Sequence, residues 1–186
     1  LNDDRVSGDT LTTGFGAANF NNRNAGLGKT VTVTGITLGG SDAANYSFNT
    51  TATTTADITQ RVLTIGAVAA NRVYNGLTGA SVLLNDDRIS GDTLTTGFGA
   101  ANFNNRNAGL GKTVTVTGIT LGGTDASNYT FNTTASTTAD ITRRALTIGA
   151  VAANKVADGN TLASVTLNDN RVSGDTLTTG FGAANF

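Results

Sequence analysis

Residues 84–103 read Leu84-Asn85-Asp86-Asp87-Arg88-Ile89-Ser90-Gly91-Asp92-Thr93-Leu94-Thr95-Thr96-Gly97-Phe98-Gly99-Ala100-Ala101-Asn102-Phe103. Nearly the same stretch begins at Leu1 and again at Leu167, so the chain of 186 residues repeats with a period of 83 residues. Solenoid coils have periods of about 20–50 residues, whereas a segment of this length can hold a core of its own. The period therefore predicts domains in series, with a β-solenoid of several coils per period as the alternative.

The spacing of apolar residues predicts an all-β fold. In residues 112–121, Val114 and Val116 alternate with threonines, which is the period of a β-strand with one buried face. The alternation breaks at Gly118, where we expect a β-bulge. Short runs of this kind, separated by loops rich in Gly and Asn, are typical of a sandwich or barrel. We expect about seven strands per repeat, arranged as a small antiparallel immunoglobulin-like β-sandwich.

The repeat boundaries are set where polar residues precede a new apolar alternation, at Gln60-Arg61 and at Arg143-Arg144. This predicts a first repeat at 1–59 (partial, its C-terminal part), a complete second repeat at 60–142, and a third at 143–186 (partial, its N-terminal part). Because the chain begins and ends inside a repeat, we expect a segment of a longer protein whose targeting signals lie outside it. The strands missing from both partial repeats would come from neighbouring chain.

A repeat of this size buries only about 60–65% of its unfolded surface, which makes a thin core. We therefore expect each repeat to depend on its neighbours. The expected core residues of the complete repeat are Leu63, Ile65, Val82, Leu84, Ile89, Leu94, Phe98, Phe103, Val114, Val116, Ile119, Leu121, Tyr129, Phe131 and Ile141.

The composition argues against several classes of function. Net charge is −1, and charged residues make up 13% of the chain, without the basic patch that nucleic-acid binding needs. There is no Cys and no His, so disulfides, thiolate metal sites and the commonest general base are absent. No apolar run approaches the roughly 20 residues of a membrane helix. We expect no enzyme activity, no catalytic or cofactor-binding residue, no nucleic-acid partner and no membrane insertion.

Asp is the only acidic residue type, and two groups of Asp and Asn suit the oxygen ligands that Ca²⁺ prefers. The weak candidates for a structural Ca²⁺ are Asp86, Asp87, Asp92, Asp125 and Asn128. No EF-hand spacing is present. Asp and Asn are also common turn residues that accept backbone N–H bonds, and this second interpretation stays open. A Lys112 isopeptide crosslink to an Asn is a further hypothesis.

An ordered series of short motifs recurs along the chain, and the resemblance that they carry covers essentially all of it. It comprises Val73-Tyr74-Asn75-Gly76, Lys155-Val156-Ala157-Asp158-Gly159, Ser90-Gly91-Asp92, Asn107-Ala108-Gly109-Leu110-Gly111-Lys112-Thr113-Val114, Gly118-Ile119-Thr120-Leu121-Gly122-Gly123-Thr124-Asp125-Ala126-Ser127-Asn128-Tyr129 and Ala139-Asp140-Ile141-Thr142. This series resembles the YDG-type repeat, which with the related MBG repeats occurs in large bacterial surface adhesins similar to filamentous haemagglutinin. The resemblance implies an extracellular, repetitive stalk or fibre at the bacterial cell surface.

The expected function is therefore structural: a repeat segment of a secreted adhesin or extracellular fibre that acts as a stalk, a spacer or a filament-forming unit. The expected partners are neighbouring repeats of the same chain, and like chains where a filament forms. The alternative is a repeated binding module for Ca²⁺, a glycan or another surface, in which weak sites gain avidity by repetition.

Overall fold

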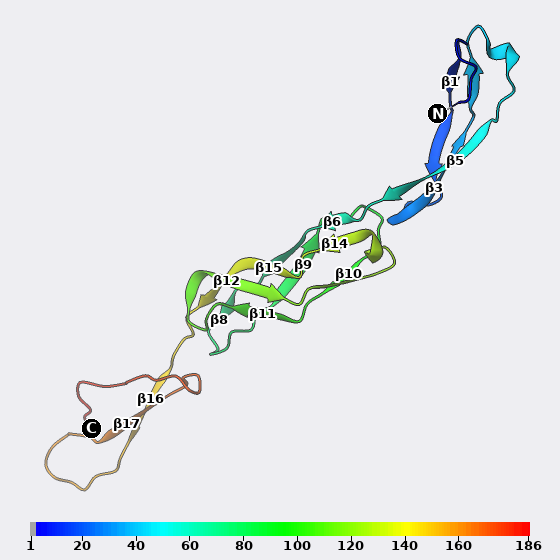
Figure 1. Ribbon diagram of the computed structural model, residues 1–186. Helices are drawn as coiled ribbons and strands as arrows, with labels where there is room; N and C mark the ends of the chain where they lie inside the picture. The colour runs from blue at the N-terminus through cyan, green and yellow to red at the C-terminus, as the bar shows by residue number, and fades with distance from the viewer. Residues whose placement is uncertain (1–2) are drawn as a thin grey trace. The chain divides into compact units, whose positions relative to one another are not determined.

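The computed structural model describes residues 3–186, and its regular structure consists almost entirely of short β-strands (Figure 1). The all-β prediction is confirmed. Leu1 and Asn2, which open the expected first repeat, lie outside the described residues.

The β-solenoid alternative is wrong. Among residues 3–186 every sheet has two to four strands, and most strand pairs are antiparallel. A solenoid would instead stack its coils as long parallel sheets.

Contacts divide the chain into two compact units, and each unit contains residues from successive repeats. Unit 1 comprises Leu1–Thr64, Arg88–Thr95 and Leu121–Phe131. Unit 2 comprises Ile65–Asp87, Thr96–Thr120 and Asn132–Phe186. The expected repeat boundaries at 1–59, 60–142 and 143–186 stay a prediction.

Unit 1 contains a three-stranded sheet in the order β2-β3-β5, built from an antiparallel hairpin and a returning strand. It also contains the parallel pair β6–β14. The strands are β1 (Thr12–Gly14), β2 (Ala17–Phe20), β3 (Gly26–Thr34), β4 (Thr37–Gly39), β5 (Thr51–Ile58), β6 (Arg61–Leu63) and β14 (Tyr129–Phe131), with the 3₁₀ turns η1 (Ala43–Asn45) and η2 (Ala126–Asn128). Strand β1 pairs with β4.

Unit 2 contains the largest sheet, in the order β11-β12-β15-β8, and the two hairpin pairs β7–β9 and β16–β17. The strands are β7 (Ile65–Ala69), β8 (Arg72–Val73), β9 (Val82–Asp86), β11 (Ala100–Phe103), β12 (Gly109–Thr117), β15 (Thr134–Thr142), β16 (Ile148–Ala152) and β17 (Val165–Asp169). Strands β10 (Thr95–Gly97) and β13 (Thr120–Gly122) form the counterpart of the β1–β4 pair.

The second repeat differs from the expected fold in strand number and direction. Ten short strands, β6 to β15, lie within residues 61–142, all of which are described. Two of the pairs are parallel, β6–β14 and β8–β15. An antiparallel hairpin can be recognised from the turn between its strands, whereas these pairs join segments far apart in the sequence. Local patterns therefore gave no signal for them.

The core of unit 2 lies on one face of its four-stranded sheet. Phe103, Val114, Ala139 and Ile141 form a buried cluster against which Val82 and other partly buried side chains pack. The alternation expected in this region is confirmed, because both valines of β12 are fully buried and the threonines that alternate with them are exposed. Burial of these side chains away from water favours folding of the unit.

The expected core is confirmed for most of its members. Those buried are Leu63, Ile65, Leu94, Phe103, Val114, Val116, Ile119, Tyr129 and Ile141. Val82, Leu84, Leu121 and Phe131 are half-buried. The prediction is wrong for Ile89 and Phe98, which are exposed. Both lie outside the strands, where alternation does not fix the direction of a side chain.

The bulge expected at Gly118 is also misplaced. Strand β12 ends at Thr117, and Gly118 turns the chain with a φ of 66°. This left-handed conformation favours glycine. The register shift of β12 against β15 lies instead between Gly109 and Lys112, around Gly111 with a φ of 57°.

Candidate functional site

The loop between β2 and β3, in the first repeat, bonds to residues of the second repeat. Arg23 forms ion pairs with Asp92, from Nη1 to Oδ1 at 3.0 Å, and with Asp125, from Nη2 to Oδ1 at 3.0 Å. Two residues further on, the backbone N–H of Ala25 donates to Oδ1 of Asn128 at 2.9 Å. We call these five residues the clasp. All of them belong to unit 1, and they tie two successive repeats together.

Asparagine side chains hold the loop that carries Arg23. Asn21 Oδ1 accepts the backbone N–H of Asn22 at 3.0 Å, and Asn22 Oδ1 accepts that of Asn24 at 3.0 Å. The Nζ of Lys29 also donates to Asn22 Oδ1. Such local side-chain to backbone bonds are the reason that Asn favours turns. These bonds hold the loop in the conformation that places the Arg23 guanidinium beside Asp92 and Asp125.

The carboxylate of Asp92 is the most enclosed group of the clasp, with only 4% of its side chain exposed. Its Oδ2 accepts a hydrogen bond from the Tyr129 hydroxyl at 2.6 Å, and the same hydroxyl accepts the backbone N–H of Ile89 at 3.0 Å. Its Oδ1 contacts Arg23 as an ion pair only, since no well-aligned hydrogen bond reaches that atom. Burial, and then the bond to Asp92, raise the pKa of the Tyr129 phenol.

Asp125 lies at the other side of the same guanidinium. Its Oδ2 accepts the backbone N–H of Thr93 at 2.9 Å, and its Oδ1 meets Arg23. The backbone bond from Thr93, followed by the charge of Arg23, lowers the pKa of this carboxyl. Both causes favour the ionised form, so the clasp joins one cation to two acidic side chains.

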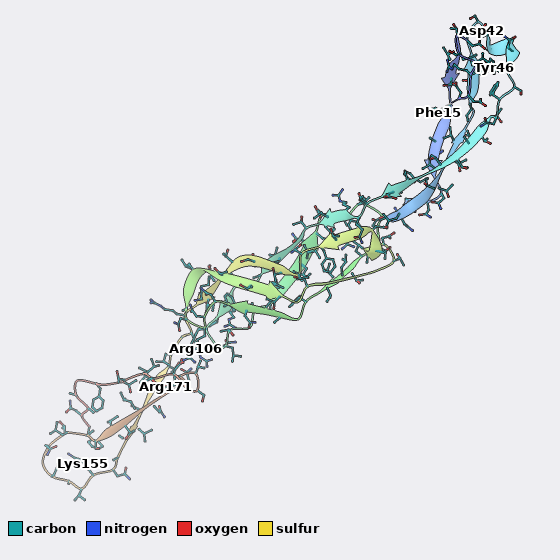
Figure 2. The ribbon with its side chains drawn as sticks, viewed as in Figure 1. Phe15, Asp42, Tyr46, Arg106, Lys155 and Arg171 are labelled. Carbon is teal, nitrogen blue, oxygen red and sulfur yellow. The ribbon has the colours of Figure 1, made fainter. Side chains whose placement is uncertain are left out.

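A related contact forms between the second and third repeats, within unit 2. Arg106, the counterpart of Arg23, lies 3.6 Å from Asp175, the counterpart of Asp92. The hydroxyl of Tyr74 donates to Asp175 Oδ1 at 2.6 Å, and this bond raises the pKa of Tyr74. Figure 2 labels Arg106 and Arg171, which both lie in this region of unit 2. Side chains of two repeats therefore meet at each of the two contacts.

A cavity of about 320 Å³ opens beside this second contact. Its lining includes Tyr74, Leu146, Val172, Asp175 and Leu177. The only ionisable side chains in the lining are arginines, Asp175 and Tyr74. The hydroxyl of Tyr74 is held by Asp175.

The residues proposed from the sequence as weak Ca²⁺ ligands fall into two groups. Asp92, Asp125 and Asn128 all belong to the clasp. There Arg23 forms ion pairs with the two carboxylates, and the backbone N–H of Ala25 donates to Asn128 Oδ1. Asp86 lies at the end of β9, opposite Ile65 across the β7–β9 pair, and Asp87 follows it. Within residues 3–186, no group of three or more His, Cys, Asp or Glu is placed to hold a metal ion. The structural Ca²⁺ stays a prediction.

Sequence reasoning found the acidic side of the clasp but missed its cation. The available signal was that Arg23 and Arg106 recur in the same asparagine-rich loop of two repeats. Lys112, considered for a crosslink, forms a hydrogen bond from Nζ to Asn105 Oδ1 at 2.5 Å on the protein surface. The same contact recurs between Lys29 and Asn22 in the first repeat.

A known protein family matches two successive parts of the chain. The family model for the YDG domain matches residues 2–56 and 59–139. The chain belongs to the YDG domain family. The second match covers nearly all of the repeat expected at 60–142, and it contains β6 to β14 of this YDG repeat. No curated protein matches the chain, and no solved structure matches it. None of the helical turns in residues 3–186 has the length and apolar character needed to cross a membrane.

Proposed function

We propose that this YDG chain is a structural repeat segment of a secreted bacterial surface adhesin or extracellular fibre, acting as a stalk, spacer or filament-forming unit. The observation that carries the proposal is the clasp, in which Arg23 and Ala25 of one repeat bond to Asp92, Asp125 and Asn128 of the next. The extracellular setting is part of the proposal and follows the resemblance of the sequence motifs to the YDG-type repeats of large bacterial surface adhesins. The partners would be neighbouring repeats and, in a filament, like chains.

The repeating unit in this proposal is the stretch of 83 residues, folded as a small immunoglobulin-like β-sandwich. Two observations support it. Strand registers recur at that spacing, as in Phe20 opposite Val31 and Phe103 opposite Val114. In addition, residues 60–83 supply strands that cover the sheet of the second repeat: β8 extends it, and β7 packs against β15.

The proposed mechanism is mechanical. Pulling on the chain would load the backbone ladders of β3–β5 and β12–β15, the two longest strand pairs. The clasp adds side-chain bonds between repeats, which would have to break before the repeats separate. Ionic and hydrogen-bonded contacts of this kind are individually weak when exposed, so resistance would come from their repetition along a long chain.

The experiment is single-molecule pulling on the full chain, comparing two arginine substitutions. Arg23→Gln removes the cation of the clasp, whereas Arg5→Gln removes a cation whose partners, Asp3 and the Leu11 carbonyl, lie in its own repeat. We expect Arg23→Gln to lower the force at which the chain first yields, and Arg5→Gln to leave this force unchanged. If both variants and the unaltered chain yielded at the same force, the clasp would not contribute to the resistance of the chain to extension.

A further inference from the structure

The turn at Asn75-Gly76 places an exposed side-chain amide next to an unshielded backbone nitrogen. Asn75 is exposed, and it is the only asparagine of the chain that is followed by glycine. Because glycine has no Cβ, other groups can approach its backbone closely. The turn needs this glycine, since Gly76 has a φ of 79°, which side-chain-bearing residues rarely adopt. The conformation of the turn therefore fixes the pair of residues.

A hydrogen bond holds the Asn75 side chain over the turn. Its Oδ1 accepts the backbone N–H of Leu77 at 3.1 Å, and this bond closes a ring of atoms that contains the Gly76 backbone nitrogen. The bond keeps the amide carbon, Cγ, within reach of that nitrogen. A donor to Oδ1 also stabilises the negative charge that develops on this oxygen when Cγ is attacked.

Arg72 holds the two ends of the turn together. Its Nη1 donates to the carbonyl of Gly79 at 2.7 Å, and its Nη2 donates to that of Leu77. The guanidinium lies 4.9 Å from the centroid of the Phe103 ring. Its Nε is buried and has no hydrogen-bond partner among the described residues. The turn thus contains a fixed cation whose hydrogen bonds go to neutral carbonyls.

The third repeat shows how the same turn holds a carboxylate. Asp158 stands at the position of Asn75, and Lys155 replaces Arg72. Asp158 Oδ1 accepts the backbone N–H of Asn160 at 3.2 Å, as in the second repeat, and forms an ion pair with Lys155 Nζ at 2.8 Å. The bond from Lys155, and then that from Asn160, lower the pKa of the Asp158 carboxyl. A carboxylate therefore fits this turn without loss of the bond to the backbone.

We propose that Asn75 is a deamidation site, at which loss of ammonia converts the turn of the second repeat into the Asp-Gly form that the third repeat carries. The Gly76 backbone nitrogen loses its proton to hydroxide and attacks Asn75 Cγ. The bond from Cγ to the side-chain nitrogen breaks, and this nitrogen leaves as ammonia with a proton from water. Water then opens the succinimide ring, at one carbonyl to an aspartyl residue and at the other to an isoaspartyl linkage. The net change is amide plus water to carboxylic acid plus ammonia.

In the aspartyl form, the new carboxylate pairs with the Arg72 guanidinium, as Asp158 pairs with Lys155. Leu77 keeps an acceptor for its N–H, because an oxygen remains at the position of Asn75 Oδ1. An opposite charge nearby favours the ionised carboxylate. The modification therefore adds a negative charge to the chain without opening the turn, and it does not depend on the proposed structural function.

Peptide mapping of the folded, full chain tests the site. The chain is kept in mildly alkaline buffer, sampled over time, digested with trypsin and analysed by mass spectrometry. We expect Asn75 to exchange its NH₂ for OH at a rate proportional to the hydroxide concentration, with aspartyl and isoaspartyl peptides separating by chromatography. Asn107 is the matched control, because it is also exposed but is followed by Ala108. It should keep its amide over the same period.

The same incubation in guanidinium chloride shows whether the fold leaves Asn75 reactive. Conversion in the unfolded chain but not in the folded chain would overturn the proposal, because the turn would then protect the amide. Equal conversion of Asn75 and Asn107 would also overturn it, since neither the glycine nor the turn would have a part in the reaction.

Asn75→Asp tests the pairing of the new carboxylate with Arg72. Its carboxyl, followed by NMR, should titrate below the range of a free aspartate. Adding Arg72→Gln should move the midpoint back up, whereas adding Arg72→Lys, the residue type of the third repeat, should keep it low. Thermal unfolding shows whether each variant is folded. A midpoint at or above that of a free aspartate in Asn75→Asp alone would exclude the pair.

Discussion

Replacing the same leucine in two repeats separates the effect of strand β14 from that of the leucine itself. In Leu63→Ala, the side chain removed is fully buried in strand β6, opposite Phe131 of β14, whereas in Leu146→Ala it is 40% exposed. The change deletes three carbon atoms, each contributing about 0.8 kcal/mol when buried. The cavity left by a buried leucine raises the loss of unfolding free energy to about 3–5 kcal/mol. At the open position, where little cavity forms, we expect about 1 kcal/mol.

Urea unfolding, followed by far-ultraviolet circular dichroism and tyrosine fluorescence, measures both losses. With a slope of about 2 kcal/mol per molar urea, Leu63→Ala should move the midpoint of its transition down by about 1.5–2.5 M. Leu146→Ala should move it by about 0.5 M. Equal shifts for the two variants would refute the reasoning, because they would mean that β14 does not cover Leu63.

Three other predictions test the ionisable groups and the turns. The pKa values of all three tyrosines are raised, so tyrosinate absorbance should appear at higher pH in the folded chain than in urea. A raised tyrosine pKa adds stability that is fully present below the unfolded-state pKa of about 10 and is lost as the pH rises through the folded-state pKa. The free energy of unfolding should therefore fall in strong alkali. The lowered pKa of Asp125 acts in the opposite range: its stabilisation is present above about pH 4 and is lost as the pH falls through the folded value. A carboxyl titration by NMR should show this, and a midpoint at or above that of a free aspartate would contradict the bonds from Thr93 and Arg23. Finally, Gly123→Ala should lower the melting temperature far more than Gly111→Ala, since both have positive φ but a Cβ at Gly123 would collide with the Thr93 carbonyl. The open position should lose only about 1–2 kcal/mol, and similar melting shifts for the two variants would exclude that collision.

The sequence allowed prediction of the features that depend on neighbours along the chain. Alternation identified the buried valines of β12, because a strand turns successive side chains to opposite faces. The break at Gly118 was visible, but its form was not, since a glycine with positive φ can end a strand as well as bulge it. Ile89 was misplaced because it lies outside a strand, where its backbone N–H donates to the Tyr129 hydroxyl and its side chain is exposed.

The contacts between repeats were beyond such reasoning. Arg23 and Asp92 lie in different repeats, and nothing local to either residue indicates the other. The parallel pairing of β6 with β14 is equally non-local. What the sequence did provide was the constancy of these residues at a spacing of 83, which the structure explains for Arg23 and Arg106 through their acidic partners.

The force–extension curve of the unaltered chain, held at its two ends, tests most directly whether the chain is a load-bearing series of repeats. An extended residue spans about 3.3–3.6 Å, so releasing one repeat of 83 residues should add about 270–300 Å of contour length before the folded distance is subtracted. We predict discrete yielding events, one of which has an increment of this size. A smooth curve without events, or a single event that releases the whole chain, would contradict the account.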